Sequence, residues 1–160
     1  MSTRFGRLTF ATAVAAFAAQ GAFLSVAVAK SQLQRVEIDT SSGKHVYSVE
    51  VMRTPAEREH GLMDRKSMPR DHGMLFDFEQ AQPVIFWMKD TLIPLDMIFV
   101  GANGRVVSIK HDAKPMDETL IPSGAATLGV IELNGGVAQE IDLKVGDEVQ
   151  NPIFHPAKNH

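Results

Sequence analysis

A polar triplet interrupts one of the most apolar stretches of the chain, FWMKDTLIPLD at positions 86–96. The stretch offers a flat aromatic ring, a thioether, a cation, a carboxylate and a hydroxyl, from Trp87, Met88, Lys89, Asp90 and Thr91. Pro94 argues against a central strand over 91–94, because proline donates no ladder hydrogen bond. The triplet is therefore predicted at a strand end that enters a loop, where binding sites are common. A solvated turn is the alternative interpretation.

Two acidic residues lie in similarly apolar surroundings, Asp96 at the end of this stretch and Glu132 within VIELN. A carboxylate among apolar neighbours is costly unless it is paired or hydrogen-bonded. We expect Asp96 to accept hydrogen bonds from loop amides and to hold the 89–94 turn. Glu132 lies either on the polar face of a half-exposed strand or across the barrel from Lys89 or Arg65.

The same residues allow two other kinds of chemistry. Asp90, Asp96 or Glu132 would serve as acid or base in a hydrolase that acts on cell-envelope material. A soft-metal site is the less favoured alternative, because thioethers select metals such as Cu(I). The methionines in question are Met63, Met68, Met74, Met88, Met97 and Met116. Methionine is also an adaptable core residue, and no histidine spacing typical of a metal site occurs, so we predict no metal and no other cofactor.

Composition narrows the classes of function. The chain has 160 residues, which suits a single domain. It contains no cysteine, which excludes disulfides, thiolate catalysis and Cys-ligated metal sites. The formal charge is −3, and no basic run with interleaved aromatic residues occurs, so nothing indicates nucleic-acid binding.

The segment 1–29 has the pattern of a secretory signal peptide. Arg4 and Arg7 give it a positive start, an apolar, alanine-rich stretch follows, and AVA at 27–29 supplies small residues before a cleavage site. The alternative is an uncleaved anchor, since the apolar stretch is marginally long enough to span a bilayer. We expect an exported protein, periplasmic or extracellular, with no membrane association beyond the signal peptide.

The rest of the chain is predicted to form many short strands separated by tight turns. The predicted strands are 33–39, 44–52, 74–78, 83–88, 96–100, 105–110, 126–134 and 147–150. Segment 83–88 is apolar on both faces and is expected to be a central strand. Segment 54–61 is predicted to be a short helix that Thr54 and Glu57 cap, and 135–141 a second short helix or a turn.

These elements predict a mainly β fold, a β-rich variant of the α+β class. The expected architecture is a small, compact, barrel-like or strongly curved antiparallel or mixed sheet with one or two short helices. Residues 30–34 would begin the mature chain, 35–150 would form the single domain, and 151–160 would form a C-terminal tail.

Four segments, taken in order and spacing, resemble the domain of unknown function 192 family: REHGLMDRKSMPRDHGMLFDF, FWMKDTLIPLDMIFV, NGRVVSI and VIELNGG. The resemblance covers residues 35 to 150 and implies a small extracytoplasmic protein with a compact β-barrel-like domain and short helices. It implies no activity. Asp90 departs from the family pattern, in which asparagine is usual, and its charge beside Lys89 would alter any preference for an anion.

We therefore expect a small extracytoplasmic binding or accessory module, with an enzyme as the alternative. Its partner would be an unknown small ligand, glycan or peptide of the cell envelope. Trp87 would stack on the ligand, and the polar triplet would contact its polar groups. Arg58 and Arg65 would add positive charge for an acidic group. The predicted ligand-binding residues are Arg58, Arg65, Trp87, Met88, Lys89, Asp90, Thr91, Asp96 and Glu132.

Overall fold

The computed structural model describes residues 33–155. The expected signal peptide at 1–29 and most of the segment 30–34 lie outside the described residues, as does the end of the C-terminal tail. Within the described range, no helix is both long and apolar enough to cross a membrane.

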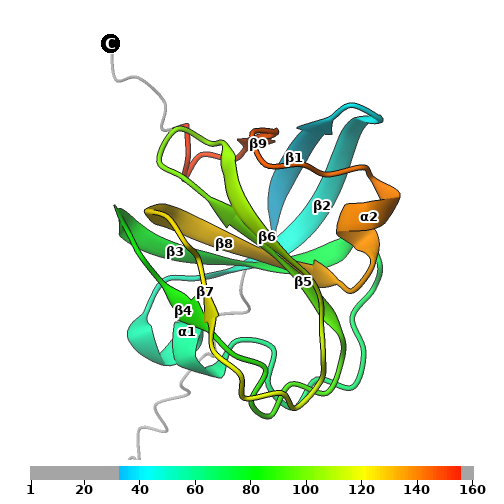
Figure 1. The fold of residues 1–160 in the computed structure, drawn as a ribbon, viewed down its shortest axis with the longest axis vertical. Coiled ribbons are helices and arrows are strands. Elements are labelled where there is room, and N and C mark those ends of the chain that lie inside the picture. The colour runs from blue at the N-terminus through cyan, green and yellow to red at the C-terminus, as the bar shows by residue number, and fades with distance from the viewer. Residues whose placement is uncertain (1–32, 156–160) are drawn as a thin grey trace, which may run out of the picture.

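One strongly curved sheet of seven strands forms the body of the molecule (Figure 1). The strands are β1 (Gln34–Thr40), β2 (Gly43–Met52), β3 (His72–Gln82), β5 (Leu95–Val100), β6 (Val106–Ala113), β8 (Thr127–Asn134) and β9 (Glu148–Gln150). They lie in the order β6-β5-β8-β3-β2-β1-β9. Neighbours are antiparallel except β2 and β3, which run parallel and are connected through the helix α1 (Pro55–His60).

The two edge strands in this order, β6 and β9, meet, so that the sheet closes on itself. Arg105, just before β6, pairs with Glu148 of β9 in an isolated antiparallel bridge. The Val106 amide donates a hydrogen bond to the carbonyl of Asp147 at 2.9 Å, and the two bridge residues also form an ion pair at 3.0 Å. The predicted mainly β, barrel-like fold is confirmed, and closure shields sheet edges that would otherwise be open to other chains.

The inner face of the sheet is buried along all seven strands, the outer face is buried over β3, β5 and β8, and each face has its own hydrophobic core. The inner core takes residues from every strand of the closed sheet, among them Val36, Val49, Leu75, Ile98, Val106, Ile131 and Val149. The outer core includes Met74, Phe76, Met88, Leu95, Met97, Phe99 and Val130. Successive residues of a strand alternate between the faces, so the central strand β5 is buried at every position. A second layer must therefore cover the outer face.

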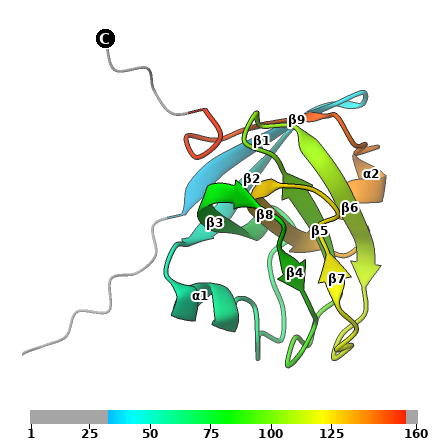
Figure 2. The ribbon, with the colours of Figure 1, turned by 60° about the vertical axis from the view of Figure 1, so that its left-hand side comes forward.

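The covering layer consists of α1 and a separate two-stranded sheet, which lie together beside the curved sheet (Figure 2). In the small sheet, β4 (Ile85–Phe86) pairs with β7 (Ile121–Pro122). The prediction of a central strand over 83–88 is therefore wrong. Val84 and Met88 face the outer core, but Ile85 and Trp87 are 63% and 42% exposed. The apolar segment 83–88 has only one buried face, as expected of a strand that covers the sheet and not of a central strand.

The capping signals of α1 act as predicted. The Thr54 side chain accepts a hydrogen bond from the Glu57 amide at 3.2 Å, and the Glu57 carboxylate accepts one from the Thr54 amide at 2.9 Å. Gly61 follows the helix with φ +48°, and a Cβ there would lie 3.2 Å from the Phe76 ring. No residue of α1 is buried, so Leu62, buried in the outer core, anchors it.

Asp96 connects the ends of several elements from within the barrel wall. The residue is fully buried, and its two carboxylate oxygens accept hydrogen bonds from the amides of Asp112 and Ala138, each at 2.7 Å. Asp112 lies near the end of β6, and Ala138 lies in the helix α2 (Val137–Glu140). The expected kind of bond is present, but its donors are not the amides of the 89–94 turn.

Replacing Asp96 tests this role. Asp96→Ala is expected to lower the free energy of unfolding by about 3 kcal/mol, because a buried amide and a part-buried amide lose their acceptor. Asp96→Asn keeps the shape and one acceptor oxygen, so its loss should be smaller. Urea unfolding of the two variants measures both changes. Unaltered stability of Asp96→Ala would contradict the role.

Candidate functional site

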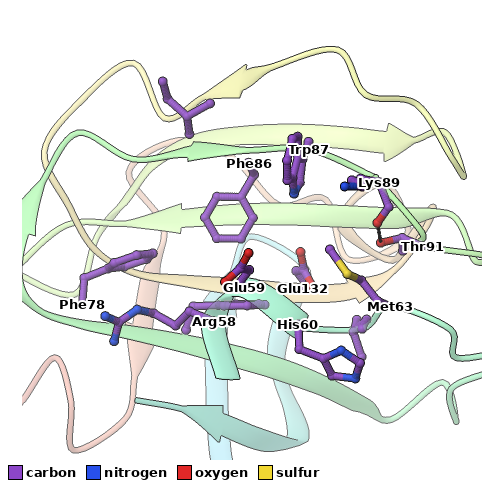
Figure 3. A pocket seen from close by; sticks show the side chains of 14 residues that line it. Arg58, Glu59, His60, Met63, Phe78, Phe86, Trp87, Lys89, Thr91 and Glu132 are labelled. Carbon is purple, nitrogen blue, oxygen red and sulfur yellow. Dashed lines mark hydrogen bonds between the residues drawn. The ribbon is translucent and has the colours of Figure 1, made fainter. Parts of the chain in front are cut away.

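A hollow of about 290 Å³ lies between α1 and the β4 segment, over the outer face of the curved sheet. In Figure 3, Phe86 and Trp87 stand on one side of it, Arg58 and His60 stand on the other, and Glu132 lies between them. The volume is close to the lower end of the range for small-molecule pockets. It is therefore large enough for a compact ligand or for one end of a longer one.

Five of the predicted ligand-binding residues line the hollow: Arg58, Trp87, Lys89, Thr91 and Glu132. The other four, Arg65, Met88, Asp90 and Asp96, are not among its lining residues. Lining residues that the sequence analysis did not select include Glu59, His60, Met63, Phe76, Phe78 and Phe86. The alternation of aromatic residues in MLFDF was the signal for two of them, because it places Phe76 and Phe78 on one face of a strand.

Aromatic rings packed edge to face make up the apolar wall. The ring centroid of Phe86 lies 5.1 Å from that of Phe76, 6.3 Å from that of Phe78 and 5.9 Å from that of Phe99, with interplanar angles of 88°, 78° and 88°. Edge-to-face pairs of this kind are favoured by the charge distribution of the rings. Phe86 therefore joins the wall of the hollow to the outer core and gives the wall a fixed shape.

The polar triplet forms a tight turn at the rim. The Thr91 amide donates a hydrogen bond to the Met88 carbonyl at 3.1 Å, and Asp90 has φ +53°. The Asp90 carbonyl accepts a hydrogen bond from the Asp64 amide at 2.9 Å, which ties the turn to the loop after α1. Aspartate and asparagine adopt this left-handed backbone more readily than other side chains do. The residue type at position 90 is therefore explained by backbone conformation.

Lys89 and Trp87 form a cation–aromatic pair beside the turn. The Lys89 ammonium lies 5.4 Å from the centroid of the Trp87 ring, within the range of a cation–π contact. The Thr91 hydroxyl donates a hydrogen bond to the Lys89 carbonyl at 3.2 Å (Figure 3). Both Trp87 and Lys89 are exposed, so this part of the wall is accessible to a ligand from solvent.

Glu132 provides the floor of the hollow. It lies in the middle of β8, between Met74 of β3 and Met97 of β5 in the sheet register, and is only 4% exposed. Thioether sulfurs donate no hydrogen bond. In the part of the chain that the structure describes, no hydrogen bond or ion pair reaches its carboxyl group, which points into the hollow in Figure 3.

Burial raises the pKa of Glu132 from 4.5 to about 8, so the carboxyl group is largely protonated at neutral pH. The expectation of a half-exposed strand at this position is wrong, since the residue is buried. The alternative expectation, a pairing with Lys89 or Arg65, is not found either. The Lys89 ammonium lies against Trp87 instead.

The two arginines have other partners. Arg65 forms a two-pronged ion pair with Glu50, with N–O distances of 2.5 and 2.8 Å. The Arg58 guanidinium donates hydrogen bonds to the carbonyls of Arg53 and Asp77 and lies 5.3 Å from the centroid of the Phe78 ring. Arg58 thus lines the hollow but is already engaged, and Arg65 adds no charge to it.

Most methionines of the described chain lie in the outer core. Among residues 33–155, no group of three or more His, Cys, Asp or Glu side chains is placed to hold a metal ion. Met74, Met88 and Met97 are fully or almost fully buried in the outer core. Met63 is the one methionine among the residues that line the hollow. These thioethers therefore act as core residues, which was the simpler interpretation of the methionine-rich segment.

The raised pKa of Glu132 allows the burial of its carboxyl group to be tested. Because the folded protein keeps a proton that the unfolded chain loses above pH 4.5, stability should fall as the pH rises from 4.5 to about 8. The limiting slope is about 1.4 kcal/mol per pH unit. Glu132→Gln, which cannot ionise, should remove this contribution to the slope and be more stable than the wild type near pH 8. Unfolding by urea across this pH range measures both curves, and parallel curves would contradict the buried, unpaired carboxyl group.

Comparison with known proteins places the chain in a family. The model of DUF192, described as Uncharacterized ACR, matches residues 36–151. A solved protein of unknown function from Novosphingobium aromaticivorans DSM 12444 is 42% identical, with a TM-score of 0.75, over 78% of this chain and 89% of that one. A solved protein from Sinorhizobium meliloti 1021, described as a candidate transcription regulator, is 40% identical, with a TM-score of 0.73, over 76% of this chain and 95% of that one. No curated protein matches the chain. The chain belongs to the DUF192 family, as its motifs predicted.

Proposed function

We propose that the protein is a small extracytoplasmic binding module whose ligand occupies the hollow between α1 and the Trp87–Thr91 turn. The observation that carries the proposal is a buried, unpartnered carboxyl group, that of Glu132, at the base of a hollow with aromatic walls. Apolar walls with a few convergent polar groups are the usual form of a small-molecule site. The partner is a small ligand of the cell envelope, or one end of a glycan or peptide.

The construction of the rim supports recognition rather than a purely structural role for this segment. Trp87 is 42% exposed although it is the only tryptophan and a large apolar side chain. A ring held at a rim by a tight turn loses little conformational freedom when a ligand stacks on it. Lys89 and Thr91 bring a cation and a hydroxyl to the same rim.

A hydrolase is the second candidate, and one observation favours it. A carboxyl group with a strongly raised pKa in a cleft is typical of catalytic acids, and Glu132 has one. The other proposed acids do not join it, because Asp96 is occupied by two amides and Asp90 does not line the hollow. Among the described lining residues, no nucleophile is hydrogen-bonded to a base, as covalent catalysis would require. Binding is therefore the better supported function.

The extracytoplasmic part of the proposal rests on the N-terminal pattern at 1–29. In a bacterial host, the protein should be recovered outside the cytoplasm, and its first residue should be Lys30. Cell fractionation and N-terminal sequencing of the recovered protein test both points. An intact N-terminus in the membrane fraction would instead support the anchor, and a cytoplasmic full-length chain would contradict export.

Two substitutions of equally exposed apolar residues test the binding surface. Trp87 lines the hollow and is 42% exposed, whereas Leu92 is 43% exposed and is not among the lining residues. The protein is melted with amines, organic acids, sugars, peptidoglycan fragments and peptides. A ligand at about 100 times its dissociation constant adds about 2.7 kcal/mol, a shift of several degrees. Trp87→Ala should fold and lose the shift, and Leu92→Ala should keep it. Unfolding of Trp87→Ala would show that the ring belongs to the core.

A further inference from the structure

We propose that the hollow binds an organic ammonium group, primary or quaternary, and that Glu132 neutralises its charge. The inference rests on the proposed binding function and names the class of ligand. Its basis is a carboxyl group that is almost completely buried, has no partner among the described residues and points into a hollow open to solvent. A buried carboxylate gains most from a cation that brings a full positive charge to it.

The aromatic wall also suits an ammonium ion. The faces of aromatic rings carry partial negative charge and attract cations, and such rings together with an acid are a common way to bind ammonium groups. The protein already uses two rings of this hollow in that manner, because Lys89 lies over Trp87 and Arg58 lies over Phe78. Both of these rings thus already face a cation, and the deeper acid is the group left without one.

Charged groups face Glu132 from several elements. Arg58, Glu59 and His60 face the hollow from α1, and Lys89 faces it from the turn. Two more charged residues lie one strand further from Glu132 in the sheet register. Glu50 is opposite Met74 and forms an ion pair with Arg65, and Lys110 is opposite Met97. Arg58 is engaged with two carbonyls. Among the described lining residues, the remaining bases are Lys89 and His60, and the other acid is the exposed Glu59, so Glu132 is the acid at the base of the hollow.

Binding of a cation must then release a proton. At neutral pH the Glu132 carboxyl group holds a proton, since burial raises its pKa to about 8. An ammonium ligand favours the carboxylate, so the proton leaves to solvent while the ligand keeps its own charge. Affinity for the ammonium ion should rise with pH up to about 8 and then level off. A ligand that accepts a hydrogen bond from the protonated carboxyl group would show the opposite trend.

Three probes of one shape and different charge test the class of ligand: phenethylamine, 2-phenylethanol and phenylacetate. We expect the purified protein to bind the amine at least about ten-fold more tightly than the alcohol, and phenylacetate most weakly. Calorimetry in buffers of different ionisation enthalpy should detect nearly one proton released per amine bound near pH 7. Tighter binding of the alcohol or the acid, or no binding of any probe, would overturn the inference.

Two substitutions assign the effect to one side chain. Glu132→Gln should abolish both the preference for the amine and the proton release, and Glu118→Gln, which removes an exposed acid that does not line the hollow, should change neither. Proton release that persists in Glu132→Gln would come from another group and overturn the assignment. If a neutral or acidic compound binds and is lost in Trp87→Ala, the binding function stands and the ammonium inference fails. If no compound of the melting panel depends on Trp87, the binding function itself fails.

Discussion

The strands β3, β5 and β8 of the curved sheet are apolar on both faces, and the rest of the structure depends on this constraint. The inner face is buried when the sheet closes on itself, with the Arg105–Glu148 bridge joining its ends. The outer face cannot be buried in that way, because it looks away from the barrel. It needs a separate cover, supplied by α1 and by the small sheet of β4 and β7. The hollow lies where these two parts of the cover stand apart, and so its floor is a strand of the sheet.

The two acids of the barrel wall show how differently a buried carboxyl group can be accommodated. Asp96 points to the inner side, where two backbone amides meet its oxygens, and so it connects β6 and α2. Glu132 points to the outer side between two thioethers, and its pKa rises because no described donor compensates for its burial. The two hydrogen bonds give Asp96 a structural role that explains its burial. The burial of Glu132 lowers the stability of the folded protein at any pH at which its carboxyl group ionises. A buried acid without a partner is therefore better explained by a ligand than by a structural role.

Local signals in the sequence were sufficient for some of these features but not for others. The capping box of α1 depends on two residues that are three positions apart in the sequence, so Thr54 and Glu57 predicted it correctly. The covering strand at 83–88 was mistaken for a central one, because a run of apolar letters does not reveal that Ile85 and Trp87 remain exposed. Arg65 was assigned to the site, although it pairs with Glu50 across the chain. Arg65 lies in the loop after α1, and a pairing between a loop and a strand depends on the tertiary fold, which one sequence does not specify.

The polar triplet at 89–91 serves the backbone and the hollow at once. Asp90 adopts the left-handed conformation of the turn, and its carbonyl fastens the loop after α1, so the turn links the two halves of the cover. Lys89 and Thr91 are consequently held at the rim, above the carboxyl group of Glu132. Filling the same space with apolar side chains would stabilise the cover by burying more surface. The fold instead keeps an open rim and a desolvated acid beneath it, which is the arrangement that a bound ammonium group would complete.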